Sequence, residues 1–478
     1  MTNKFGLKSL VAALALVGGI SAAEAVTITI NNVNAAGVGF NDVTPAAPVG
    51  GNPGTTLGEQ RLYAFTYAAN IWGATLNSDV PIIIDASFEP LTCTATSATL
   101  GSAGATTVFI NLQDQNGNDV GLPNTLYGGA LANKLSGVDN AEGAAVIKAR
   151  FNSNLGLNAN CLPGSTFYLG VDNNHGALLD FPTVLLHEMG HGVGFQTFTN
   201  GSSGAQLAGY PSIWDYFLLD NRTNKHWVDM TNDERKASAI SGNGLSWTGA
   251  GVTAAVPGVL SRAPILTVTG PASGTNAGDY AVGEASFGPV LANPPVSGQL
   301  MPVVDQANGT GLACNPLSAV NTLAVRGNIA LVDRGVCSFN IKAQNVQAAG
   351  AKGMIVVDNV AAALSGLGGT DPSITIPSVR VTLADGTKLK SALTKRSRTS
   401  SGVVASLGRS LSKYAGSDSQ GRALLYTPTT YSPGSSVSHY STEAFRNQLM
   451  EPAINGDLTH SPLLPYDLTY ELLKDIGW

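Results

Sequence analysis

Residues 185–195 read Leu-Leu-His-Glu-Met-Gly-His-Gly-Val-Gly-Phe, and this stretch decides how the rest of the sequence is interpreted. On a helix, positions i and i+4 lie on one face, so His187 and His191 can bind one metal ion. Imidazole nitrogens suit zinc, which in catalytic sites has three protein ligands and one water. Glu188 then lies beside that water and can act as general base. The motif predicts a catalytic zinc site with one ligand still to be found.

The surrounding residues favour a helix. Asp180 is a good N-cap, and Pro182 fits the first turn because its missing N–H is not needed there. An apolar run precedes the motif, and the glycines at 190, 192 and 194 favour a helix end shortly after His191.

The first residues of the chain are typical of an export signal. Lys4 and Lys8 give a basic start, residues 10–20 are apolar, and Ala23-Glu24-Ala25 fits a cleavage site. The apolar run is too short to span a bilayer, and no later run reaches about eighteen apolar residues. We therefore expect a signal peptide over residues 1–25 and a secreted or periplasmic protein without a membrane span.

Charge and cysteine content narrow the possible partners and the redox compartment. Charged residues make up 12% of the 478 residues and the net charge is -6, without a basic block beyond residues 395–398, so nucleic acid is not an expected partner. Four cysteines in an exported chain predict two disulfides. Of the three possible pairings we favour Cys93–Cys161 and Cys314–Cys337, because each stays inside one expected domain.

The order of predicted elements indicates an α/β (α+β) fold with the zinc helix packed under a sheet. Residues 58–76 have the apolar period of a helix, and 468–476 a shorter one. Residues 248–276, rich in Gly, Ala, Pro and Ser, are interpreted as a passage between domains. Strands are expected at residues 26–30, 80–88, 106–112, 144–154, 166–170 and 422–428.

The segment Asp114-Gln-Asn-Gly-Asn-Asp119 is dense in oxygen ligands. It lacks the bidentate glutamate of an EF-hand loop, so a polar turn is the preferred interpretation and Ca²⁺ binding the alternative.

Residues 327–357 follow a second pattern: strand, glycine-containing turn, amphipathic helix and buried strand. Their core, Gly-Asn-Ile-Ala-Leu-Val-Asp-Arg-Gly-Val-Cys-Ser-Phe over 327–339, closely resembles the protease-associated (PA) domain, as do Ala-Ala-Gly-Ala at 348–351 and Ile-Pro-Ser-Val at 376–379. The resemblance implies a non-catalytic lid or binding module over residues 264–408. It would divide a catalytic domain into residues 26–263 and 409–478.

The third zinc ligand is not given by the first motif. A compact metzincin has histidine six positions after the second, where this sequence has Thr197, a poor ligand. His175 is expected to be structural or near the cleft rim, and His460 to lie on the surface in a polar loop. The candidates that stay open are His439, His226, Asp215 and Glu234.

The surroundings of one of these candidates resemble leishmanolysin-like metzincins, in which an inserted domain separates the first motif from the third histidine. The resemblance rests on Ser-His-Tyr at 438–440 and Leu-Met-Glu-Pro at 449–452. The resemblance implies Glu188 as general base and Met450 as the methionine turn beneath the metal. Tyr440, where the family usually has tryptophan, and the PA-type insert depart from the pattern. The implied ligands are His187, His191 and His439.

The predicted function is a secreted zinc endopeptidase that acts on proteins or peptides, with the PA domain modulating substrate access. An extended substrate would pair with a sheet edge, for which residues 144–154 are the candidate strand. The alternative is a non-catalytic adhesion or binding protein with a structural zinc. The presence of Glu188 argues against it, because a structural site does not need that carboxylate.

Overall fold

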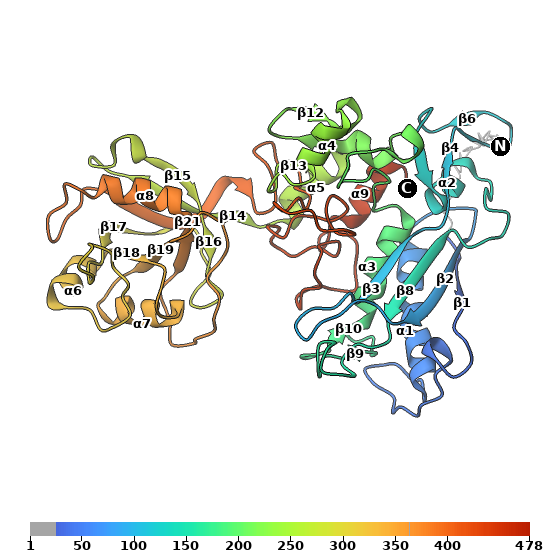
Figure 1. The fold of residues 1–478 in the computed structure, drawn as a ribbon, viewed down its shortest axis with the longest axis horizontal. Helices are drawn as coiled ribbons and strands as arrows, with labels where there is room; N and C mark the ends of the chain where they lie inside the picture. The colour runs from blue at the N-terminus through green and yellow to red at the C-terminus, as the bar shows by residue number, and fades with distance from the viewer. Residues whose placement is uncertain (1–24, 363) are drawn as a thin grey trace, which may run out of the picture.

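The computed structural model describes residues 25–362 and 364–478, which form two lobes joined by a pair of strands (Figure 1). The predicted signal peptide lies outside the described residues, apart from Ala25. Within the described part of the chain, we find no helix that is both long enough and apolar enough to cross a membrane.

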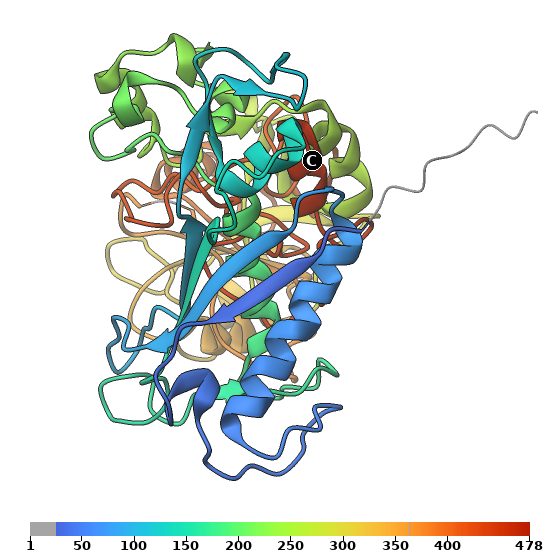
Figure 2. The same ribbon diagram turned by 90° about the vertical axis from the view of Figure 1, so that its right-hand side faces the viewer.

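A four-stranded sheet organises the first lobe, with α1 (Leu57–Thr75) and α3 (Phe181–Val193) packed against it (Figure 2). Thr56 begins α1 with a capping box to Glu59, and Trp72 of that helix donates to the backbone of α3 at Leu186, 3.1 Å away. The strand order is β1-β2-β8-β3, for β1 (Ile28–Asn32), β2 (Ile82–Glu89), β8 (Ile147–Asn152) and β3 (Gly101–Ala105).

The edge of this sheet differs from the prediction. Residues 144–154 contain β8, which is paired with β2 on one side and β3 on the other, so it is not a free edge. The edge strand is β3, Gly-Ser-Ala-Gly-Ala, which pairs antiparallel with β8. Its small residues carry none of the β-branched signal that marks strands.

Shorter elements complete the first lobe. Three small sheets pair β4 with β7, β5 with β6 and β9 with β10, and a further sheet has the order β12-β11-β13. The bounds are β4 (Val108–Ile110), β5 (Leu112–Gln113), β6 (Asp119–Val120), β7 (Leu126–Gly128), α2 (Gly129–Ser136), β9 (Phe167–Tyr168), β10 (Leu179–Asp180), β11 (Leu218–Asp220), β12 (Lys225–His226), α4 (Asn232–Ser238), β13 (Leu245–Trp247), α5 (Ala250–Val259) and α9 (Thr469–Ile476), with 3-10 turns at Gly39–Asn41, Leu207–Gly209, Ile213–Phe217 and Trp227–Asp229.

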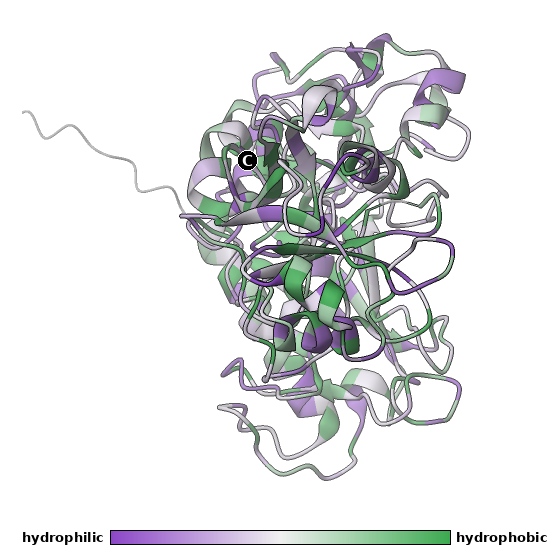
Figure 3. Cartoon of the chain, turned by 90° about the vertical axis from the view of Figure 1, so that its left-hand side faces the viewer, coloured by the Kyte–Doolittle hydropathy of each residue, from purple (hydrophilic) through white to green (hydrophobic). Residues whose placement is uncertain are grey.

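The second lobe is built on an eight-stranded mixed sheet of order β15-β14-β21-β17-β18-β19-β20-β16. Viewed from its own side, hydrophobic residues lie in its strands and helices and hydrophilic ones recur in its loops (Figure 3). The bounds are β14 (Arg262–Thr269), β15 (Gly278–Ala281), β16 (Gly283–Glu284), β17 (Val296–Pro302), α6 (Ala319–Val325), β18 (Ile329–Asp333), α7 (Phe339–Ala348), β19 (Gly353–Val357), β20 (Ser378–Val381), α8 (Leu383–Ala392) and β21 (Val404–Tyr414), with a 3-10 turn at Gly274–Asn276.

Residues 248–276, predicted to be a passage between domains, contain helix α5 and strand β14. The buried residues of α5 belong to the core of the first lobe and those of β14 to the core of the second. Alanine and valine support α5 despite Pro257 in its interior. Residues 422–428 form only isolated bridges, such as Leu425 with Tyr440, rather than a strand.

Each lobe has its own hydrophobic core. The core of the first lobe takes its buried residues from two separate stretches, Val26 to Leu260 and Ala423 to Ile476. The second lobe has clusters on the two faces of its sheet, all drawn from Leu266 to Leu407. The second lobe therefore interrupts the sequence of the first lobe without contributing to its core.

One disulfide lies in each lobe. Cys93–Cys161 closes a 68-residue separation in the first lobe, and Cys314–Cys337 a 23-residue separation in the second. This is the predicted pairing.

Candidate metal centre

Helix α3 carries the first motif and is buried along its whole length. The side chain of Asp180 caps it by accepting from the N–H of Thr183 at 2.9 Å. The glycines do more than end the helix. A Cβ at Gly190 would lie 2.7 Å from Sδ of Met450, and one at Gly192 would lie 2.6 Å from Ile147. They allow the helix to pack closely between the sheet and the C-terminal segment.

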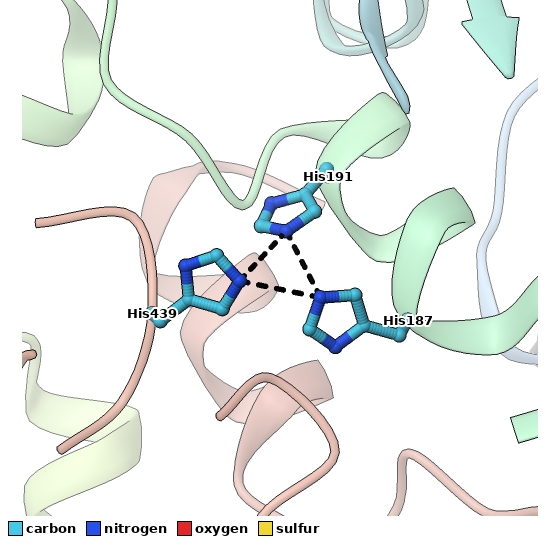
Figure 4. A group of neighbouring side chains, drawn as sticks. All are labelled: His187, His191 and His439. Carbon is cyan, nitrogen blue, oxygen red and sulfur yellow. Dashed lines mark hydrogen bonds between the residues drawn. The ribbon is translucent and has the colours of Figure 1, made fainter. Parts of the chain in front are cut away.

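Three histidine side chains converge at this helix (Figure 4). The Nε2 atoms of His187, His191 and His439 are 3.2 Å from one another in each of the three pairs. Tetrahedral ligands about 2.1 Å from zinc lie roughly 3.4 Å apart, so the three nitrogens have the spacing of a zinc ligand set.

The opposite nitrogen of each ring fixes its orientation. Nδ1 of His187 donates to the carbonyl of Leu449 at 2.7 Å, that of His191 to Phe195 at 2.8 Å, and that of His439 to Ser435 at 2.8 Å. A carbonyl oxygen only accepts, so each Nδ1 carries the proton and each Nε2 presents a lone pair to the centre. This tautomer is the one that a metal requires.

Burial keeps the three imidazoles neutral. It lowers the pKa of His187 to about 4 and, together with the neighbouring His187, that of His191 to about 3. Burial and the two other rings hold the pKa of His439 well below its usual value. Near neutral pH the cluster therefore offers three uncharged donors and does not repel a divalent cation.

Glu188 lies beside the triad against the edge strand β3. Burial raises the pKa of its carboxyl to about 8, opposed by the backbone N–H of Ala103 and the charge of Arg150. A Cβ on Gly101 would come within 2.8 Å of the Glu188 side chain. Strand β3 therefore needs glycine at this position to let the carboxylate occupy its place.

Met450 packs against helix α3 at Gly190 and is fully buried. Its carbonyl accepts from the N–H of Tyr440 at 2.8 Å, which ties it to the segment that carries His439. The Tyr440 hydroxyl in turn donates to the carbonyl of Leu468 at 3.1 Å.

The other candidate ligands lie elsewhere. Asp215 is buried and accepts from the hydroxyls of Thr197 and Thr199 at 2.7 and 2.6 Å, so its oxygens are already used. Glu234 caps α4 and pairs with Lys225 at the surface, and His226 lies in strand β12. His175 is outside the triad, where its Nδ1 donates to Leu178 at 2.8 Å.

His460 is not a surface residue, contrary to the sequence-based prediction. Its Nε2 lies 2.6 Å from the Asp180 carboxylate, and both side chains are buried. Asp180 is the cap of α3, so a C-terminal loop anchors the start of the helix that carries the motif. No sequence pattern marks this pairing, because the residues are 280 positions apart.

Asp467 is a supporting residue that the sequence did not indicate. Its carboxylate accepts from the N–H of Leu449 at 2.6 Å, and the carbonyl of Leu449 orients His187. Such partners of ligand residues orient the ligands they contact.

The proposed calcium segment forms a polar turn. The Asp114 carboxylate accepts from the backbone N–H groups of Asn116 and Asn118 at 2.8 and 2.9 Å. Among the described residues, the histidine triad is the one cluster of His, Cys, Asp or Glu side chains with the spacing of metal ligands.

The triad opens into a cleft whose lining includes Glu188, strand β3, Arg150 and the segment after Met450.

Comparison with known families accounts for the second lobe. Residues 296–389 match the PA domain family. The second lobe is hereafter the PA lobe, and its β18-α7-β19 unit is the strand, helix and strand predicted from the sequence.

Similarity to characterised proteins is limited to part of the chain. The chain is 36% identical over 101 residues to the probable lipoprotein aminopeptidase LpqL of Mycobacterium tuberculosis, covering 21% of this chain and 20% of that protein. It is 39% identical over 67 residues to the minor extracellular protease Vpr of Bacillus subtilis, covering 14% and 8%. The chain thus spans about one fifth or less of the length of these two relatives.

Solved structures match about a third of the chain. The aminopeptidase from Aneurinibacillus sp. strain AM-1 matches with 21% identity and a TM-score of 0.22, covering 33% of this chain and 37% of that one. The subtilisin-like protease Apa1 from Pseudoalteromonas sp. AS-11 matches with 20% identity and a TM-score of 0.24, covering 37% and 38%.

Proposed function

We propose that this protein is an exported zinc-dependent endopeptidase, similar to leishmanolysin-like metzincins. In this proposal a PA domain over residues 264–408 interrupts a catalytic domain made of residues 26–263 and 409–478. The observation that carries it is the set of three Nε2 lone pairs at 3.2 Å spacing, with a buried carboxylate one residue after the first ligand.

The residues fit zinc. His187, His191 and His439 supply three neutral nitrogen donors, and each is oriented by a backbone carbonyl. When bound, zinc polarises the scissile carbonyl and makes a water nucleophilic near neutral pH.

Glu188 moves the proton in this mechanism. Its carboxylate takes a proton from the attacking water and passes it to the nitrogen of the leaving amine. Without metal, burial raises the pKa of the Glu188 carboxyl to about 8. The positive charge of a bound zinc ion would lower that pKa and favour the carboxylate form, which accepts the water proton. The glycine at position 101 keeps the neighbouring strand out of its way.

Strand β3 would bind the substrate. It is the edge of the sheet and borders the cleft, so its outer backbone groups can pair with an extended peptide. Pairing along a strand recognises the peptide backbone on both sides of the scissile bond, which suits cleavage inside a chain. Strand β3 therefore replaces residues 144–154 as the proposed substrate-binding strand, because β3 is at the edge of the sheet and β8 is not.

An aminopeptidase is the second candidate. One relative is named an aminopeptidase, and Glu451 brings a second carboxylate to the cleft, where it could hold a terminal amine. Both oxygens of Glu451 already accept hydrogen bonds, from the N–H of Gln448 at 2.8 Å and the amide of Asn455 at 3.2 Å, which favours the endopeptidase.

The test uses internally quenched peptides with acetylated N-termini and amidated C-termini, alongside the same peptides with free N-termini. We expect the zinc-loaded protein to cleave the blocked peptides and Glu188→Gln to lose at least about 100-fold in kcat/KM while keeping one zinc per chain. Cleavage only of the peptides with free N-termini would indicate the aminopeptidase. Bound zinc without cleavage, and with the variant indistinguishable, would favour the non-catalytic binding protein.

A further inference from the structure

Among the described residues, Arg150 is the only arginine or lysine that lines the cleft. It lies on β8, where Ile147, Ala149 and Phe151 face the core and the alternate residues Lys148 and Arg150 face outward. The side chain is thus on the outer face of the sheet but reaches the substrate cleft.

The guanidinium of Arg150 extends from β8 towards the edge strand. Its Nη2 donates to the hydroxyl of Ser102 on β3 at 3.3 Å, and its Nε lies 3.7 Å from a carboxylate oxygen of Glu89. Both members of this ion pair are 40% exposed. An ion pair this open contributes little to stability, so it does not by itself account for a cation at the cleft. Nη1 makes no hydrogen bond with any described residue.

The register of the sheet shows what the guanidinium faces. Ser87 on β2, Arg150 on β8 and Ser102 on β3 are direct neighbours in one row across the sheet. A peptide added to the free edge of β3 would continue this row with one of its own side chains, about 4.8 Å beyond Ser102. Because the Ser102 side chain is short, an arginine and a glutamate placed on either side of it can meet across it.

We propose that Arg150 is a specificity-determining residue that selects an acidic side chain at the substrate position opposite Ser102. This inference rests on the proposed peptidase function and on substrate pairing with β3. A carboxylate at that position accepts charge-assisted hydrogen bonds from the guanidinium, which an amide or a lysine does not match. The guanidinium is partly exposed to water and lies near Glu89, so we expect the preference for an acidic substrate side chain to be modest.

Lys148 offers a matched control. It is on the same strand and the same outward face, two residues from Arg150, and is paired with Gly104 of β3, but it is not part of the cleft lining. Replacing it removes the same charge from the same surface without touching the proposed subsite.

The experiment measures kcat/KM for blocked peptides that carry Glu, Gln or Lys at each position on both sides of a cleaved bond. For the wild type at low salt we expect one position to prefer Glu over Gln about three- to fivefold, and 0.5 M NaCl to weaken the preference. Arg150→Gln should abolish it, Arg150→Glu should turn it into a preference for Lys, and Lys148→Gln should leave it unchanged. Zinc content and thermal unfolding of each variant establish that it is folded.

Three outcomes overturn the inference. The first is that no position of the wild type prefers Glu, and the second is that the preference survives Arg150→Gln. The third is that Lys148→Gln reduces the preference as much as Arg150→Gln does. In these cases cleavage itself persists, so the proposed function stands and the specificity assignment alone fails. If the wild type cleaves none of the peptides, both fail together.

Discussion

The two lobes differ in how their cores are assembled from the sequence. The first lobe builds its core and its histidine triad from residues on both sides of an interruption, whereas every cluster of the PA lobe comes from one continuous stretch. The first lobe brings together three metal-ligand side chains, and no comparable group occurs in the described residues of the PA lobe. Among the described residues, the candidate metal site is thus confined to the discontinuous lobe.

The largest expected effect comes from the residue that links the two halves of the first lobe. His439→Ala removes one of the three nitrogen donors. Loss of a residue that only hydrogen-bonds to a ligand lowers metal affinity by up to roughly 100-fold, so loss of the ligand itself should lower zinc affinity by well over that factor. Zinc per chain after dialysis against a chelator measures this. His226→Ala, the rejected candidate, is the control and should keep its zinc. Loss of zinc from the control instead would contradict the arrangement described.

The second prediction separates the stability of the lobes. Cys314→Ser with Cys337→Ser opens a 23-residue separation and should destabilise the PA lobe by about 3 kcal/mol, because the unfolded chain gains freedom. Calorimetry should show one transition shifted and one unmoved, with zinc content unchanged. The paired control is Cys93→Ser with Cys161→Ser, which should shift the other transition, since that disulfide is in the first lobe. A single transition that moves in both variants would mean that the lobes unfold as one unit.

The smallest expected effect tests the independence of the first lobe directly. Arg262 and Tyr414 are paired antiparallel where the PA lobe begins and ends, so a two-residue Asn-Gly turn can replace residues 263–413 and close a hairpin. Zinc content and cleavage of short blocked peptides should stay within about threefold of the full chain, as expected when a domain with its own core is removed. The same shortened chain with Glu188→Gln is the negative control for cleavage. Loss of zinc on shortening would show that the first lobe needs its insert.

The sequence revealed the local parts of the site and missed most of its supports. Asp180 and Pro182 predicted the start of α3, and the spacing of His187, Glu188 and His191 predicted which face they share. His439 was reached only by resemblance, because no periodicity connects residues 248 positions apart.

The missed elements have physical reasons. Strand β3 has the sequence Gly-Ser-Ala-Gly-Ala, and its glycine is required by the contact with Glu188 rather than by strand propensity. His460 was placed on the surface because its neighbours in sequence are polar, yet its partner is the cap of a buried helix. Contacts of this kind are set by the tertiary fold, so local composition does not report them.

The placement of His439 also fixes when the triad can form. It is made 248 residues after His191, with the whole PA lobe in between. At roughly 5 to 20 residues per second, the ribosome needs about 12 to 50 s to pass from the second histidine to the third. Throughout that interval the nascent chain holds only two of the three imidazoles, so the metal centre cannot be complete until the whole PA lobe has been synthesised.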